Sequence, residues 1–440
     1  MSDVAVRTSD EQRPTVAATR PAPAPKRRAA ATPTIGLFVT STRPASPSQA
    51  RLQQSIFQGL RALADDRFDF VVLSFDAKGA DDLPFRHEQI RTRRRWADIG
   101  HGLAAGGAGG ALALWRFLGA TGGRTLRTLE RWAVVEPAHF RQLRTLNVRL
   151  LWNVNQHALE TPTPFVRTIW EANHRIHSMY PEYAYARYGF DGVDGGMADS
   201  LARASYVVTG TETGKNQLVR MLGVHESKVR VIPFPAPRLP PAAASYSPAT
   251  DRFILYPARF WPHKNHVVIL EALALLRDQG RDLRSVFTGA DGGMLRYVMD
   301  YAERLGVRDL VDWRGQVSDA ELAALYSTAW ALVYASAVGP DNLPPLEAMA
   351  LGCPVIAADA PGAREQYGEA ALFFPPTDEH ALVARLTALG DDGVRAGLIR
   401  RGSALASART GNAYAAAMLA ILDEFAKVAR AWERCDSVVW

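Results

Sequence analysis

Short apolar runs alternate with amphipathic segments along most of this chain, beginning near residue 34. Residues 34–39 and 70–73 have the composition of buried strands, and residues 48–63 between them carry the apolar spacing of an amphipathic helix. Two more runs of strand type lie at 150–154 and 165–170. Strands separated by helices pair in parallel, because a parallel connection must cross back over the sheet. We therefore expect a parallel α/β sheet in the first half of the chain.

A run of prolines interrupts this pattern near the middle of the chain. Five prolines lie between residues 233 and 241, and they indicate a linker between two domains. The alternation resumes at residues 253–258 and continues to an apolar helix over about residues 414–428. The sequence therefore predicts an α/β protein with a disordered tail (1–33), an amino-terminal domain (34–235), a linker (236–249), a carboxyl-terminal domain (250–410), and a final helix and tail (411–440).

Composition supports more than one folded core. At 440 residues, with 48% hydrophobic and 22% charged residues, the chain is too long for a single core and has the balance of an ordinary globular protein. The first 33 residues are rich in Ala, Pro, Thr and Arg and lack the apolar segment of a signal peptide. No run approaches the ~20 apolar residues of a membrane span. We expect a cytoplasmic protein.

The formal net charge of +6 favours anionic partners such as phosphorylated ligands or acidic lipid. Nucleic acid is the weakest interpretation, because no recognition motif accompanies the arginines. Only Cys353 and Cys435 are present, so the sequence predicts neither a disulfide framework nor a cysteine metal site. No Asp-x-Asp segment follows a predicted strand, and we expect no metal.

Arginine and tryptophan concentrate between residues 91 and 131. Two basic helices are predicted there, on either side of a Gly- and Ala-rich segment at 102–114. The glycines do not form a dinucleotide-binding motif, because no strand precedes them. Basic helices with tryptophan beside an apolar face can rest on anionic lipid. A packed helical pair with a solvated basic edge fits the same residues equally well, so peripheral membrane contact is one of two open interpretations.

Two cations follow the first predicted strand of the carboxyl-terminal domain. The strand at 253–257 enters a loop that holds Arg259 and Lys264, and a helix follows from about Asn265. Ligands of parallel sheets bind at the carboxyl ends of the strands, where these side chains are placed. The pair suits a phosphorylated ligand, and the alternative is a pair of solvated surface cations.

One acid lies in the first turn of a short predicted helix near residue 345. Pro344 and Pro345 favour a helix start, and Gly352 favours its end. Glu347 is then a first-turn acid, and the N–H groups around Asn342, Leu343 and Leu346 could hold an anion. The alternative is an ordinary loop, helix and strand with a solvated acid.

A polar loop follows the strand at 165–170, with the sequence Glu171-Ala172-Asn173-His174-Arg175. This loop is also expected at the carboxyl edge of a parallel sheet. His174 is a candidate catalytic residue by proximity, and a structural or acceptor-contacting histidine is the alternative. Glu171 is a candidate polar group on the acceptor side.

The segment around Glu347 and the loop with Arg259 and Lys264 together resemble the donor site of the retaining GT-B glycosyltransferases of group 1. That resemblance implies two Rossmann-like domains that face each other across a cleft, with a final helix that returns to the first domain. It implies that Arg259 and Lys264 grip the donor diphosphate and that Glu347 holds the ribose hydroxyls. It also implies that backbone groups of Gly315, Gln316 and Val317 lie against the base, and that Asn342 and Leu343 line the donor site.

The chain departs from the family pattern at two positions. The family has an acid, seven residues and a second acid, and the position of the first acid falls on Gly339. Asp341 is the only nearby carboxylate, and it is a candidate substitute. The family often has a histidine directly after the strand at 165–170, where this chain has Trp170.

The resemblance implies a retaining transferase of a bacterial cell envelope or polysaccharide pathway. We expect a hexose, mannose or a similar sugar, to pass from a nucleotide-sugar donor to a polysaccharide or lipid-linked glycan, without a metal or a cofactor other than the donor. Two alternatives share the architecture: a nucleotide-sugar epimerase, and a catalytically impaired protein that binds nucleotide-sugar. The missing acid at Gly339 favours the second of these.

Overall fold

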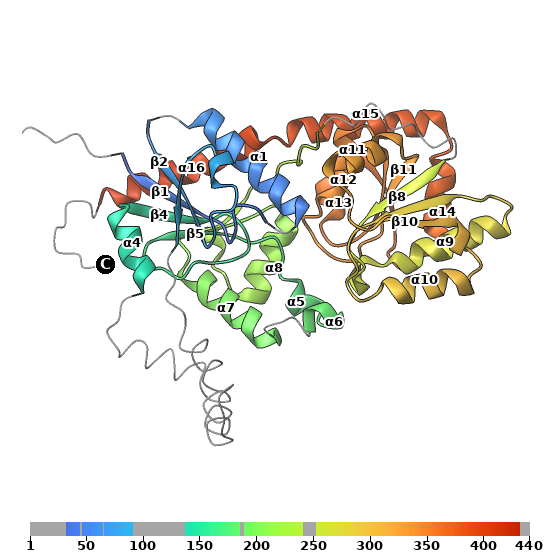
Figure 1. The fold of residues 1–440 in the computed structure, drawn as a ribbon, viewed down its shortest axis with the longest axis horizontal. Coiled ribbons are helices and arrows are strands. Elements are labelled where there is room, and N and C mark those ends of the chain that lie inside the picture. Colours follow the sequence, from blue (N-terminus) through green and yellow to red (C-terminus); the bar gives the residue numbers. More distant parts are fainter. Residues whose placement is uncertain are drawn as a thin grey trace, which may run out of the picture. The chain divides into compact units, whose positions relative to one another are not determined.

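The computed structural model describes residues 32–44, 46–64, 66–90, 137–184, 189–240 and 252–431. These residues form two parallel sheets with helices packed on them, which confirms the predicted α/β class (Figure 1). Almost all of the predicted tail, the whole basic segment at 91–131 and most of the linker lie outside the described ranges. No helix within those ranges combines the length and apolar character needed to cross a membrane.

The first sheet, within the described ranges, has seven strands in the order β3-β2-β1-β4-β5-β6-β7, and all neighbouring strands are parallel. The strands are β1 (Thr34–Phe38), β2 (Asp69–Ser74), β3 (Arg86–Gln89), β4 (Val148–Asn153), β5 (Phe165–Thr168), β6 (Tyr206–Thr209) and β7 (Val229–Val231). The accompanying helices are α1 (Pro47–Leu63), α4 (Ala138–Thr145), α5 (Asn173–Ile176), α6 (Pro181–Ala184), α7 (Gly189–Arg203) and α8 (Glu212–Leu222).

The second sheet has six described strands, all parallel, in the order β10-β9-β8-β11-β12-β13. The strands are β8 (Phe253–Pro257), β9 (Arg284–Thr288), β10 (Val311–Trp313), β11 (Ala331–Tyr334), β12 (Val355–Ala358) and β13 (Ala371–Phe374). The helices are α9 (His266–Asp278), α10 (Leu295–Arg304), α11 (Asp319–Thr328), α12 (Pro344–Ala350), α13 (Ala363–Tyr367), α14 (Glu379–Ala388), α15 (Asp392–Ala408) and α16 (Gly411–Ala429). The central strands β8, β11 and β12 are buried on both faces and lie in one apolar core.

The last helix, α16, packs on the first sheet although it follows the second sheet in the chain. It joins the apolar cluster of β1 and α1 through eight buried residues, among them Tyr414, Met418, Leu422 and Phe425. A Cβ on Gly59 of α1 would lie 2.1 Å from the carbonyl oxygen of Gly411, so only glycine permits this close approach. Figure 1 shows α16 in red beside α1 in blue. A helix from the end of the chain thus completes the core of the first sheet.

Candidate functional site

Lys264 ends the short 3-10 helix that follows β8, and its ammonium lies among neutral oxygens. Its Nζ is 3.3 Å from the Tyr334 hydroxyl, 3.2 Å from Ser336 Oγ and 3.5 Å from Asn342 Oδ1. Tyr334 and Asn342 are themselves joined by a hydrogen bond of 2.9 Å, donated by the hydroxyl. Lys264 forms no ion pair with any residue that the structure describes. Its charge is therefore held in place without a carboxylate in contact.

Two carboxylates act on Lys264 from a distance. Burial lowers the pKa of Lys264 to about 8, and the charges of Glu171 and Glu182 oppose that shift. The ammonium form still predominates at neutral pH. A partly buried cation whose nearest partners are neutral can accept an anionic ligand without first losing a protein carboxylate.

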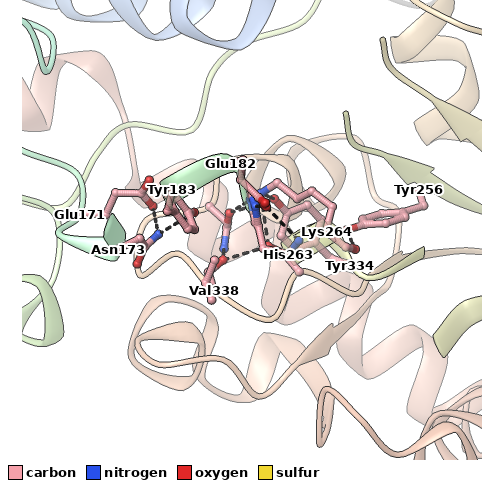
Figure 2. A network of polar contacts seen from close by, with 11 residues as sticks. Glu171, Asn173, Glu182, Tyr183, Tyr256, His263, Lys264, Tyr334 and Val338 are labelled. Atoms are coloured by element: carbon pink, nitrogen blue, oxygen red, sulfur yellow. Dashed lines mark hydrogen bonds and ion pairs between the residues drawn. The ribbon is translucent and has the colours of Figure 1, made fainter. Parts of the chain in front are cut away.

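Glu182, on α6 beside the first sheet, contacts the loop that carries Lys264 (Figure 2). Its Oε1 accepts a hydrogen bond of 3.0 Å from the backbone N–H of His263 and another from the His263 ring at Nδ1. Burial, followed by the charge of Lys264, lowers the pKa of His263 to about 4, so the ring is neutral at pH 7. This contact is therefore a hydrogen bond from neutral histidine. Glu182 Oε2 is buried without a described partner.

Glu171, in the loop after β5, belongs to the same network. Its Oε2 accepts a hydrogen bond from Asn173 Nδ2, and Asn173 Nδ2 also lies 3.2 Å from the Tyr183 hydroxyl. The Tyr183 ring stacks on the His263 ring at 5.3 Å between centroids. Burial raises the pKa of Glu171, and the charge of Lys264 opposes that shift. Figure 2 shows Glu171, Asn173 and Tyr183, which follow β5 in the chain, close to His263 and Lys264, which follow β8.

Glu347 lies in a separate cluster, in the first turn of α12, and only 1% of its surface is exposed. Arg51 of α1 donates to its Oε1 from Nε at 3.2 Å and from Nη2 at 2.7 Å, and the Tyr326 hydroxyl donates to Oε2 at 3.1 Å. Arg51 is also buried, and its Nη1 pairs with Asp319 at the start of α11. Burial raises the pKa of Glu347, and Arg51 opposes that shift. An ion pair thus joins the first helix of the chain to α12.

Other predicted donor-site residues take different positions. Arg259 is exposed, with its Cζ 4.9 Å from the centroid of the Trp261 ring. Gly315 has a φ of +64°, and its carbonyl accepts from the N–H of Gly289 at 2.7 Å. Gln316 is exposed and Val317 packs partly on the core. Their predicted roles toward phosphate and base stay predictions.

The start of α12 offers fewer backbone donors than we predicted. The carbonyl of Leu343 accepts from the N–H groups of Leu346 and Glu347 at 2.9 and 3.1 Å. The N–H of Leu346 is therefore not available to an anion, because the first helical turn already uses it. Pro344 and Pro345 supply no N–H at the same end.

The missing first acid has a backbone explanation. Gly339 has a φ of +107°, which L side chains rarely adopt, and a Cβ there would lie 2.9 Å from Asn342 Nδ2. This loop conformation therefore strains any side chain at position 339, an acid included. Asp341 packs its Oδ1 so closely on Gly210 that a Cβ on that glycine would be 2.1 Å away, and Asp341 Oδ2 is buried without a described partner. Burial raises the pKa of Asp341 well above its ordinary value.

His174 lies on α5 and is buried against α7. Its Nε2 is 3.0 Å from Asp194 Oδ1, and its ring lies 5.7 Å from that of Phe190. Among the residues that the structure describes, no hydrogen bond, ion pair or ring contact joins His174 to Lys264, Arg259 or Glu347. Its catalytic role stays a prediction.

The structure thus brings Lys264 and Asn342 together and pairs Glu347 with a residue that sequence reasoning missed. Arg51 and Glu347 are 296 positions apart, and no local pattern links them. His263, Glu182 and Tyr183 were also missed, since their alignment depends on how α6 meets the loop after β8. The prolines and glycines around α12 were informative, because they act locally.

Comparison with known proteins shows which family this chain resembles. Residues 242–402, which include Lys264 and Glu347, match the family model described as "Glycosyl transferases group 1". The resemblance to that family is thereby confirmed. O-antigen chain mannosyltransferase B of Escherichia coli is 28% identical over 48% of this chain and 58% of its own length. O-antigen chain mannosyltransferase RfbU of Salmonella typhimurium is 31% identical over 41% of this chain and 49% of its own length. The chain therefore spans about half the length of these group 1 relatives.

Solved structures match nearly the whole chain. A sucrose-phosphate synthase from Thermosynechococcus elongatus superposes with a TM-score of 0.64 at 18% identity, covering 90% of this chain and 100% of that one. A glycosyltransferase from Rickettsia africae has a TM-score of 0.58 at 16% identity, covering 90% of this chain and 99% of that one. At these identities the likeness establishes the fold. The predicted GT-B architecture of two α/β sheets is confirmed.

Proposed function

We propose that this protein is a retaining glycosyltransferase that moves a hexose, mannose or a similar sugar, from a nucleoside diphosphate sugar to a polysaccharide or lipid-linked glycan. The observation that carries the proposal is Lys264, a partly buried cation that touches only neutral oxygens. It lies at the carboxyl end of β8, inside the segment that matches the group 1 family. A diphosphate would supply the anion that this site lacks.

The names of related proteins support the choice of a hexose such as mannose and of a nucleotide-sugar donor. Two curated relatives are named as mannosyltransferases of the O-antigen chain. HepE from Anabaena, which shares the fold at 15% identity and a TM-score of 0.59, has been solved with UDP-glucose. Mannose is favoured by the first comparison and a uridine donor by the second, so both GDP-mannose and UDP-glucose are donors to test.

The chemical task is to stabilise the diphosphate as it leaves the anomeric carbon. Charge-assisted hydrogen bonds from Lys264 and Arg259 to the phosphate oxygens are worth ~1.5–3 kcal/mol each. They accelerate the reaction to the extent that they strengthen while the bond breaks. In the retaining mechanism, the acceptor oxygen bonds to the anomeric carbon on the face that the diphosphate leaves. The acceptor proton passes to the departing phosphate oxygen.

Glu347 is proposed to hold the donor ribose, within limits set by its contacts. A carboxylate has about four acceptor positions, and protein donors occupy three of them: two from Arg51 and one from Tyr326. One position on Oε2 is left for a ribose hydroxyl. Glu347→Ala should weaken binding of nucleoside diphosphate in calorimetry, and an unchanged affinity in a folded variant would remove Glu347 from the site.

Other parts of the proposal are untested predictions. No group of three or more His, Cys, Asp or Glu side chains is placed to hold a metal in the described part of the chain, and metal independence stays a prediction. So do the cytoplasmic location and the peripheral membrane contact through residues 91–131.

The deciding experiment follows the fate of the donor. The purified protein is incubated with UDP-glucose or GDP-mannose, with and without lipid-linked oligosaccharide from a bacterial envelope, and both nucleoside diphosphate and donor sugar are measured. Transfer predicts that nucleoside diphosphate is released only when acceptor is present. Conversion of the donor to an isomer without release would identify an epimerase. Calorimetric binding of donor with neither reaction would identify a catalytically impaired binding protein.

A further inference from the structure

Glu171, in the polar network around Lys264, has one carboxylate oxygen that no described residue contacts by a hydrogen bond. Its Oε2 is bonded to Asn173, and Oε1 has no hydrogen-bond partner among the described residues. Unlike Glu182 Oε2 and Asp341 Oδ2, it is not among the atoms that are both sealed from solvent and unpaired. A ligand hydroxyl can therefore reach Glu171 Oε1, whereas the unpaired oxygen of Asp341 is closed off.

Asn173 adds a second unsatisfied acceptor beside it. An ionised carboxylate only accepts hydrogen bonds, so the amide nitrogen of Asn173 must face Glu171 and the amide oxygen must face away from it. That oxygen, Oδ1, is buried without a described partner, and only 2% of the Asn173 surface is exposed. Buried polar atoms are nearly always hydrogen-bonded. Asn173 Oδ1 is sealed from solvent like the unpaired oxygens of Glu182 and Asp341, so Asn173 contributes by holding Oε2 of Glu171.

The position of Glu171 relative to Lys264 indicates which part of the donor it meets. Asn173, which donates to Glu171, also lies 3.2 Å from the Tyr183 hydroxyl, and the Tyr183 ring stacks on His263, the residue before Lys264. The charge of Lys264 also opposes the rise that burial causes in the pKa of Glu171. In the proposed function, Lys264 holds the diphosphate, and the transferred sugar is bonded directly to that diphosphate. The sugar hydroxyls are thus the donors that can meet Glu171 Oε1.

We propose that Glu171, positioned by Asn173, binds a hydroxyl group of the transferred sugar through Oε1. The contact comes from the loop after β5, on the first sheet. The inference rests on the proposed function and goes beyond it by assigning the residues that discriminate the sugar.

The test separates binding of the sugar from binding of the nucleotide. Dissociation constants are measured by calorimetry for UDP and UDP-glucose, and for GDP and GDP-mannose, with wild-type protein and with Glu171→Gln. Gln has the same shape and still accepts from Asn173, so the fold should hold, and the melting temperature checks this. A lost charge-assisted contact weakens binding of the sugar nucleotide by about tenfold or more. Affinity for the free diphosphate should change by less than about twofold.

Glu182→Gln is the matched control. Glu182 also acts on the charge of Lys264, but its Oε1 is used by His263. This variant should affect diphosphate and sugar nucleotide equally. If Glu171→Gln does the same, Glu171 acts only through Lys264 and the inference is wrong. If Glu171→Gln fails to fold, Asn173→Ala is measured instead: it releases Oε2 of Glu171, and it should weaken binding of the sugar nucleotide more than binding of the free diphosphate, whereas equal losses would contradict the inference. Wild-type protein that binds neither UDP nor GDP would instead overturn the proposed function itself.

Discussion

The surroundings of Glu347 and of Glu171 differ in how completely protein donors satisfy a carboxylate. Glu347 accepts three hydrogen bonds, two of them from a buried arginine, and is 1% exposed. Glu171 accepts one, from Asn173, and faces a lysine whose contacts are neutral oxygens. The contacts of Glu347 are made with protein groups and stabilise the fold. The arrangement around Glu171 leaves binding capacity for a ligand, because its polar groups are only partly paired.

The comparison also separates the two halves of the chain. Glu347 lies in the segment that matches the group 1 family, and Glu171 lies outside it. Glu347, inside the segment that matches the family, is held mainly by protein contacts. Glu171, outside that segment, has an oxygen that is not paired with protein. Variants in each cluster should therefore change different quantities, and the expected effects are given from the largest to the smallest.

Arg51→Met should cause the largest change, a loss of about 3–5 kcal/mol in the free energy of unfolding, measured by urea denaturation. The variant leaves Glu347 buried without its cation. The double variant Arg51→Met/Glu347→Gln should recover a large part of the loss, because no buried charge remains unpaired. Arg43→Ala is the control: Arg43 pairs with Asp82 at the surface, with 68% and 72% of the side chains exposed, and its loss should stay below ~1 kcal/mol. If Arg51→Met and Arg43→Ala lowered the free energy of unfolding equally, the buried ion pair would stabilise the fold no more than the surface pair, and the prediction would be wrong.

Lys264→Ala should reduce turnover by at least about tenfold, the scale of one lost charge-assisted hydrogen bond. The melting temperature should not fall much, because the substitution removes a cation that burial disfavours. Lys215→Ala serves as control, since Lys215 pairs with Glu226 on the surface near α8. Full activity in folded Lys264→Ala would reject the leaving-group role of this residue.

Raising the pH should remove the same charge reversibly. Burial lowers the pKa of Lys264 to about 8, and the protonated form is the one that binds phosphate. The ratio kcat/KM should therefore stay level below pH 8 and fall about tenfold per pH unit above it, since this ratio reports groups of the free enzyme. Lys264→Arg should move this decline to higher pH, because guanidinium stays charged. A wild-type profile that stays flat to pH 10 would show that Lys264 is not the essential cation.

Tyr326→Phe should have the smallest effect. It removes one neutral donor from Glu347 and leaves Oε2 without that partner, at a cost of about 1–3 kcal/mol in the free energy of unfolding. The ion pair with Arg51 remains, so the loss should be smaller than for Arg51→Met. A Tyr326→Phe loss that exceeded the Arg51→Met loss would reverse the order of the two contacts.

Local patterns were enough to predict much of the fold and part of the site. Alternating strands and helices predicted both sheets, because apolar spacing reports which faces must be buried. Pro344, Pro345 and Gly352 placed α12, since proline and glycine restrict the backbone at their own positions. The family motifs located Lys264 and Glu347 for the same reason, as each lies within a short continuous segment.

Side-chain partners between distant segments could not be read in this way. Arg51 of α1 meets Glu347 of α12 across 296 positions, and Glu182 of α6 meets His263, after β8, across 81, because elements of the two sheets pack against each other. Both contacts depend on tertiary packing, which leaves no periodic pattern in the sequence. The strain on an acid at Gly339 follows from the positive φ that this residue has in the folded loop. Whether an acid is satisfied by protein or open to a ligand is therefore a property of the assembled fold.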